Sequence, residues 1–276
     1  MKKIIFIIFG IIFFPAISLA QADFATLSIP YTSEIPDGKW VAPWNNACEE
    51  ASIVMVEQYY LGNKNKTINR TTAKNLMWPL FKYEDKKIKT NADTDAKFTK
   101  LLIDEYTTFD ATIKDNPTLE DIKEEISAGH PVITLHYGFG LKNPLIPFRR
   151  TGSSYHVMVL KGYDDAKKEF IVNDPGNHTS GLDYRYKYDI IMGTLHDFNY
   201  KTKKVDGPAR VLFTQPKQLV KIKGGSSIYL VKDDAKHIIL NPSVFKTRNW
   251  KWSAVKNVTA EWLGQFTTGT PIGELK

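Results

Sequence analysis

The order of two hydrophobic patterns constrains the fold of this chain most. Up to about residue 128, apolar side chains recur at helical spacing, which predicts helices over 47–61, 71–82 and 95–106. A fourth helix is predicted to open at a capping box over 118–121 and to end at Gly129 and Pro131. From Val132 onward, short β-branched and aromatic runs predict strands over 132–137, 155–163, 169–174 and 210–215. Helices followed by strands predict an α+β domain, with N-terminal helices packed on an antiparallel sheet.

The first 20 residues differ from the rest of the chain. Lys2 and Lys3 precede an apolar run from Ile4 to Phe14, and small residues follow at Ser18 and Ala20. This pattern is typical of a secretory signal peptide. We therefore expect a secreted or extracellular bacterial protein, either free or associated with the cell envelope, with no transmembrane segment after cleavage. An uncleaved N-terminal anchor is the alternative.

Two further regions follow the signal peptide. Residues 21–218 hold the predicted helices and strands, and residues 219–276 are predicted to form a small aromatic-rich C-terminal module. Residues 223–227, Lys-Gly-Gly-Ser-Ser, resemble a linker near the start of that module. The aromatic content, which includes Trp250, Trp252 and Trp262, leads us to expect cell-wall polymers as partners of the module.

Charge and cysteine content exclude several function classes. The net charge is +7, without a dense Lys/Arg stripe interleaved with aromatic residues, so no nucleic-acid partner is expected. Cys48 is the single cysteine, which excludes a disulfide framework and a Cys-based zinc site. The histidines show no ligand spacing with carboxylates, so the sequence predicts neither a metal nor another cofactor.

Cys48 is either a buried small hydrophobic residue or a nucleophile. It lies at the first turn of the predicted 47–61 helix. The N-terminus of a helix stabilises an anion, so we expect a lowered thiol pKa there. Glu49 and Glu50 follow directly and oppose the thiolate, which would then need a nearby imidazolium.

A predicted hairpin supplies the base. If residues 164–167 form its turn, His156 lies opposite Pro175, one residue from Asp174. Asp174 could then fix the tautomer of His156 while the other ring nitrogen faces Cys48, which is the arrangement of nucleophile, base and orienting group in acyl-transfer enzymes. A structural histidine and a turn aspartate are the alternatives for each residue alone.

These segments together resemble a known family. The residues Cys48-Glu49-Glu50-Ala51-Ser52, the run from Tyr155 to Asp164 and the run from Phe170 to Pro175 are similar to papain-like cysteine peptidases of the bacteriocin-leader-processing (double-glycine) type. The stand-alone secreted relatives are the nearer match, over about residues 28–217. Glu49 and Glu50 depart from the commoner Cys-Gly-Pro.

The resemblance implies a cysteine endopeptidase acting on peptide or protein substrates, with Cys48 as nucleophile, His156 as general base and acid, and Asp174 as orienting residue. It also implies an upstream amide, usually Gln, that stabilises the oxyanion. No Gln lies between Ala22 and Cys48, so Asn45 and Asn46 are the oxyanion candidates, with Asn45 favoured. Glu34 occupies a Thr-Ser-Glu-Ile-Pro stretch in which a Gln would be at home.

Two other functions remain open from the sequence. One is a different acyl transfer on the same fold, such as peptidoglycan amide hydrolysis. The other is a catalytically inactive envelope-binding protein, in which Glu49 and Glu50 have abolished catalysis by Cys48.

Overall fold

The computed structural model describes residues 22–88, 93–144, 146, 154–176, 180–232, 235–248 and 250–274. Its larger sheet has seven strands in the order β2-β7-β3-β4-β5-β6, and β1 pairs with β4 beside this path. All the strand pairs of this sheet are antiparallel. The strands are β1 (Phe24–Thr26), β2 (Phe109–Asp115), β3 (Val132–Tyr137), β4 (Tyr155–Asp164), β5 (Glu169–Asn173), β6 (Tyr184–Lys187) and β7 (Arg210–Pro216).

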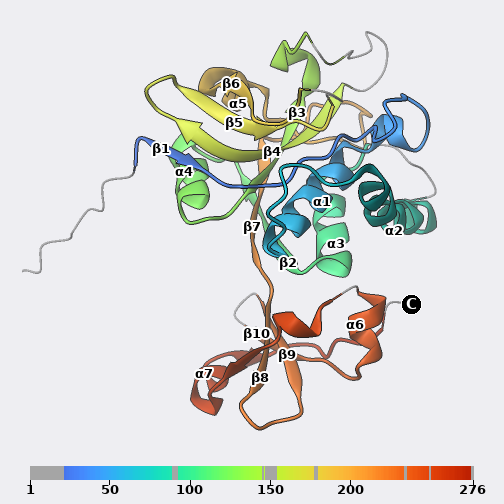
Figure 1. The fold of residues 1–276 in the computed structure, drawn as a ribbon, viewed down its shortest axis with the longest axis vertical. Coiled ribbons are helices and arrows are strands. Elements are labelled where there is room, and N and C mark those ends of the chain that lie inside the picture. The colour runs from blue at the N-terminus through green and yellow to red at the C-terminus, as the bar shows by residue number, and fades with distance from the viewer. Residues whose placement is uncertain are drawn as a thin grey trace, which may run out of the picture.

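Helices cover both faces of this sheet (Figure 1). Alternate residues of β4 point to opposite faces, as in any strand. Val157 and Val159 join the core that includes α1, α2 and α3, whereas Met158 and Leu160 join the core that includes α4 and α5. The helices are α1 (Cys48–Tyr60), α2 (Arg70–Ile88), α3 (Ala96–Tyr106), α4 (Leu119–Ser127) and α5 (Tyr188–Thr194), with short 3-10 helices η1 (Trp44–Asn46) and η2 (Gly138–Leu141).

α1 is the central helix of the domain. Every residue from Cys48 to Glu57 is buried, because α1 packs against β4 on one side and α2 on another. A helix enclosed in this way is apolar around most of its circumference. Glu49, Glu50 and Glu57 are therefore buried carboxyl groups, and their surroundings decide much of the chemistry of the site.

The α+β class with an antiparallel sheet is confirmed. The four predicted helices and four predicted strands correspond to α1–α4 and to β3, β4, β5 and β7. Thr118 and Asp121 form the capping box that opens α4, with reciprocal hydrogen bonds of 3.0 and 2.8 Å. The elements β1, β2, β6 and α5 were not predicted.

The predicted register of the β4–β5 hairpin was wrong by one to two residues. The turn occupies residues 165–168 and not 164–167, so that Tyr163 pairs with Phe170, and a bulge after Leu160 brings that residue opposite Val172. Lys168 adopts a φ of 54°, a conformation that only a few per cent of non-glycine residues take. Nothing in its residue type signals this turn.

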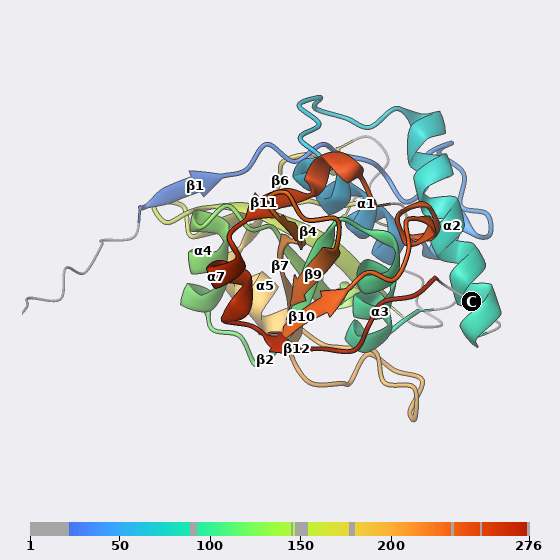
Figure 2. The same ribbon diagram turned by 90° about the horizontal axis from the view of Figure 1, so that it is seen from below.

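A second sheet begins at Gln218. Its order is β11-β8-β9-β10-β12, and Figure 2 shows it from below the larger sheet. Residues 223–227 are not a linker, because they lie in the connection between the paired strands β8 and β9. The elements are β8 (Gln218–Ile222), β9 (Ile228–Lys232), β10 (Ala235–Ile238), α6 (Ser243–Thr247), η3 (Trp252–Ala254), β11 (Lys256–Val258), α7 (Ala260–Gly264) and β12 (Thr267–Thr268).

Lys217 ties the two sheets together. It is the single residue between β7 and β8, and its buried ammonium donates hydrogen bonds to the carbonyls of Ile103, Asp104 and Thr107 at 2.8–3.2 Å. These carbonyls lie at the C-terminal end of α3, where a cation is favoured. Arg248 adds an ion pair of 2.7 Å to Glu105.

Residues 1–20, predicted as a signal peptide, lie outside the described residues. Within the part that the structure describes, no helix is both long and apolar enough to span a bilayer.

Candidate active site

Cys48 is the first residue of α1 and is 3% exposed. Its thiol donates a hydrogen bond to Oε2 of Glu49 at 3.0 Å. Burial and the charge of Glu49 raise the pKa of the thiol well above its usual value. The expected lowering by the helix N-terminus is thus outweighed, because a thiolate here would lose water and face carboxyl groups.

His156 and Asp174 form a buried pair. Nε2 of His156 lies 2.7 Å from Oδ1 of Asp174. Burial alone would lower the pKa of His156, but the charge of Asp174 and its hydrogen bond raise it. Burial would raise the pKa of Asp174, but His156 and further donors lower it. This pairing confirms the juxtaposition that the hairpin predicts, although the register differs.

Asp174 accepts hydrogen bonds from several donors besides His156. The Tyr186 hydroxyl donates to Oδ2 at 2.6 Å, the Gly176 N–H donates to Oδ1 at 3.1 Å, and the Asn143 amide reaches Oδ2 at 3.4 Å. A carboxylate with several donors stays ionised even when fully buried. Tyr186 lies on β6, which sequence patterns missed, although the alternation Tyr-Arg-Tyr-Lys over 184–187 is a strand signal.

Two observations place the N-terminal half of α1 beside the start of β4. Ser52, one turn after Cys48, donates to the carbonyl of Val157 at 3.4 Å, and Val157 follows His156. The electrostatic neighbours of Cys48 and His156 also overlap, since Glu34 and Glu49 act on both. Because Nε2 is bound to Asp174, Nδ1 is the ring nitrogen that could exchange a proton with a thiol.

Glu34 is a site residue that the sequence analysis did not choose as an oxyanion candidate. It is 4% exposed, and its N–H donates to the carbonyl of Pro175 at 3.0 Å. A Cβ atom on Gly176 would stand 2.8 Å from Cε1 of His156 and 3.3 Å from Oε1 of Glu34, so the carboxyl and the imidazole flank the same glycine. A hydrogen bond joins the Glu34 carboxyl to the backbone of Ala47, directly before Cys48.

Burial raises the pKa of Glu34 to about 7, with the charge of His156 opposing the rise and that of Asp174 adding to it. When its carboxyl is neutral, Glu34 can donate a hydrogen bond through its O–H, as a Gln side chain does through its N–H groups.

Asn45 and Asn46 lie in η1, just before Cys48. Asn45 is exposed and Asn46 is half-buried, whereas Glu34 is buried beside His156. Donors act most strongly on a developing charge in a water-excluded place. Of these three side chains, only that of Glu34 is buried, and the oxyanion role of Asn45 and Asn46 stays a prediction.

Glu49 and Glu50 bind neighbouring elements. Oε1 of Glu49 accepts from the N–H and hydroxyl of Thr94 at 2.9 and 3.2 Å, and Glu50 shares a hydrogen bond with Glu84 of α2. Burial, and then the charge of Glu50, raise the pKa of Glu49 to about 8, and burial raises that of Glu84 to about 8. These hydrogen bonds join the N-terminal turn of α1 to Thr94 and to α2.

His136 is opposite His156 in the β3–β4 pair. Its Nδ1 lies 2.9 Å from the Thr194 hydroxyl, and burial lowers its pKa to about 3, so it stays neutral. Among the described residues, no group of three or more His, Cys, Asp or Glu side chains is arranged to hold a metal ion.

Comparison with known proteins indicates the family to which the chain belongs. The model of the Peptidase_C39 like family matches residues 26–204, which is more than half of the chain. No curated protein matches. A solved structure, described as a C39-like peptidase from Bacillus anthracis, is similar at 14% identity with a TM-score of 0.43, over 70% of this chain and 97% of that one. From the family match, we conclude that this chain belongs to the C39-like family of cysteine peptidases.

Proposed function

We propose that the chain is a secreted cysteine endopeptidase that hydrolyses peptide bonds through an acyl-thioenzyme on Cys48. The observation that carries the proposal is the buried pair of His156 and Asp174 beside α1, which begins at the only cysteine. Family membership supports a peptide substrate. The first 20 residues support export.

The proposed reaction begins when Cys48 turns from Glu49 toward His156. Nδ1 of His156 takes the thiol proton as Sγ bonds to the substrate carbonyl carbon. His156 then gives that proton to the amine as the peptide bond breaks, which leaves a thioester on Cys48. A water molecule, deprotonated by His156, then attacks the thioester carbon. The C–S bond breaks, the carboxylic acid leaves, and His156 returns its proton to Sγ to restore the thiol. Asp174 fixes the ring and stabilises the imidazolium.

Two donors are proposed for the oxyanion. The N–H of Cys48 opens α1 and so has no acceptor within the helix. The second donor is the O–H of neutral Glu34, which takes the part of the amide that the family commonly uses. Above its pKa of about 7, Glu34 becomes an anion and would repel the oxyanion.

One observation favours a second function, an inactive envelope-binding protein. The thiol is buried and bonded to Glu49, with a raised pKa. Such a cysteine would be inert if it never turned toward His156.

The test is hydrolysis of β-casein and of purified peptidoglycan by the whole chain, with Cys48→Ala and His156→Ala as matched variants. We expect casein cleavage that both substitutions abolish. Amide hydrolysis of peptidoglycan alone would indicate the other acyl-transfer activity. Inactivity on both substrates would support the envelope-binding protein.

A further inference from the structure

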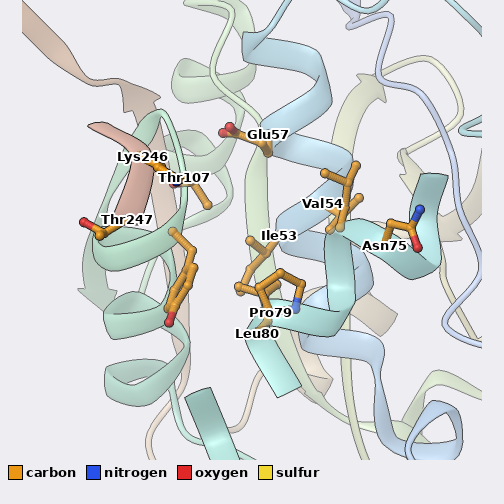
Figure 3. A pocket seen from close by; sticks show the side chains of 11 residues that line it. Ile53, Val54, Glu57, Asn75, Pro79, Leu80, Thr107, Lys246 and Thr247 are labelled. Atoms are coloured by element: carbon orange, nitrogen blue, oxygen red, sulfur yellow. The ribbon is translucent and has the colours of Figure 1, made fainter. Parts of the chain in front are cut away.

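Two hollows flank one ridge on α2. The ridge consists of Asn75 and Pro79, which line both hollows. The first hollow has a volume of about 620 Å³ and is also lined by Trp44, Lys74 and Trp78. The second has a volume of about 340 Å³ (Figure 3). We call the two hollows and their shared ridge the α2 trough.

Helical spacing explains why the hollows adjoin. Side chains four residues apart lie above one another on a helix. Lys74 and Trp78 therefore form one stripe of α2, Asn75 and Pro79 the next, and Leu76 and Leu80 a third. The third stripe faces the second hollow. Its other walls are Ile53, Val54 and Glu57 of α1, Tyr106 and Thr107 at the C-terminal end of α3, and Lys246 and Thr247 of α6.

The trough connects the catalytic end of the domain with the second sheet. Trp44 belongs to η1, four residues before Cys48, and Lys246 belongs to α6. Figure 3 shows Lys246, Thr247 and Thr107 across the second hollow from Asn75. One end of the trough is thus lined by the 3-10 helix that precedes Cys48.

The ridge offers polar groups that suit a peptide backbone. Asn75 is exposed, and its side-chain amide makes no hydrogen bond within the described chain. Pro79 lies inside α2 and has no N–H, so the carbonyl of Asn75 lacks its helical hydrogen bond. The side-chain amide of Asn75 can donate to and accept from the main chain of a polypeptide that crosses the ridge, and the carbonyl of Asn75 can accept from it.

The hollows themselves suit apolar side chains. Trp78 is 47% exposed, although it also packs against Trp44 and Phe81. Ile53, Val54 and Leu80 line the second hollow with aliphatic surface. Lys246 is exposed and forms no ion pair with the described residues, so an acidic group would be favoured at that end.

We infer that the α2 trough binds an extended segment of the polypeptide substrate, with apolar side chains in the two hollows, the main chain over Asn75, and an acidic group at Lys246. This inference rests on the proposed function for the identity of its ligand. It gives the second sheet a role, because α6 completes the far end of the trough.

The test separates binding from catalysis. Fluorescently labelled β-casein, an unfolded polypeptide that is both apolar and acidic, is titrated into the full chain carrying Cys48→Ala, and the dissociation constant is measured by anisotropy. Trp78→Ala should weaken binding about tenfold, as loss of a central Trp anchor commonly does. Lys246→Glu and Asn75→Ala, both at exposed positions, should each weaken binding about threefold.

Trp252→Ala is the matched control, since Trp252 is 54% exposed and lies outside the trough. It should bind casein as the parent does. Equal affinity of the parent and the three trough variants, equal weakening by Trp252→Ala, or no casein binding by the parent would overturn the inference. Trough-dependent binding without casein hydrolysis by the wild-type chain would instead retain the trough and reject the proposed peptidase.

Discussion

Asp174 and Glu49 are equally buried, yet burial has opposite outcomes for them. The pKa of Asp174 is lowered, because it accepts from His156, Tyr186 and Gly176. The pKa of Glu49 rises to about 8, because burial raises it and its acidic neighbours Glu50 and Asp93 raise it further. The charge of the neighbours, cationic for Asp174 and acidic for Glu49, therefore decides which of these two equally buried carboxyls is ionised.

This difference divides the site into two halves. The ionised half consists of His156 and Asp174, which form a preformed ionised pair. The acidic half consists of carboxyls around the N-terminus of α1 that favour their protonated forms, namely Glu34, Glu49, Glu50 and Glu84. We therefore expect the first half to act in proton transfer, and the second half to set the pH range in which the site is intact.

The largest effect should come from the ionised half. Asp174→Asn keeps the size of the side chain but removes the charge that raises the pKa of His156. It should reduce kcat/KM for casein by about 10³-fold or more. Circular dichroism would verify that the variant is folded. A loss below tenfold would contradict the role of Asp174.

The acidic half should make the protein less stable as pH rises. The folded-state pKa values of Glu49 and Glu84, about 8, exceed their ordinary value of 4.5. The native state therefore keeps protons that the unfolded state releases, and stability is lost between about pH 4.5 and pH 8. Asp174 titrates below this window.

The expected loss is about 4 kcal/mol for each of these two groups between pH 5 and pH 8.5, to order of magnitude, from 1.36 kcal/mol per pKa unit. Urea unfolding at pH 5 and pH 8.5 would measure it. Glu84→Gln should flatten the dependence, and a free energy of unfolding that increases over this range would contradict the prediction.

Much of the ionised half could be predicted from the sequence. A strand ending near Asp174 and a strand starting at Tyr155 bring His156 to the carboxylate even with the register wrong, because both side chains lie at the same end of the hairpin. Tyr186 was missed with its short strand β6.

The acidic half could not be predicted, since its properties come from burial by residues distant in the chain. Glu34 contacts Pro175 through its backbone, and Glu50 pairs with Glu84 of α2. A residue type does not reveal whether a carboxyl is protonated. Helix position alone accordingly gave the wrong sign for the pKa shift of Cys48.

A smaller effect should follow when Glu49 loses its charge. Glu49→Gln removes the nearest group that raises the pKa of Cys48. The thiolate fraction should rise about tenfold for each pKa unit recovered. Alkylation of the single cysteine by iodoacetamide at pH 9, above the pKa of about 8 at which Glu49 ionises, followed by intact mass, measures this rise. Glu50→Gln, which bonds Glu84 instead, is the control, and equal rates in both variants would reject the effect.

The smallest effect should come from Tyr186→Phe. It removes one hydrogen bond of 2.6 Å from Asp174 but leaves those of His156 and Gly176. We expect kcat to fall about fivefold with KM unchanged, which corresponds to about 1 kcal/mol. Steady-state kinetics on casein would check this, and a change confined to KM would argue against a positioning role.

The most direct measurement of the central claim is the pH dependence of kcat/KM for wild type and Glu34→Gln. Neutral Glu34 is the proposed oxyanion donor, and its pKa is about 7. Wild-type activity should therefore fall as pH rises through 7, whereas Glu34→Gln, which keeps a donor at every pH, should retain activity to higher pH. Superimposable alkaline limbs in the two proteins would contradict the account.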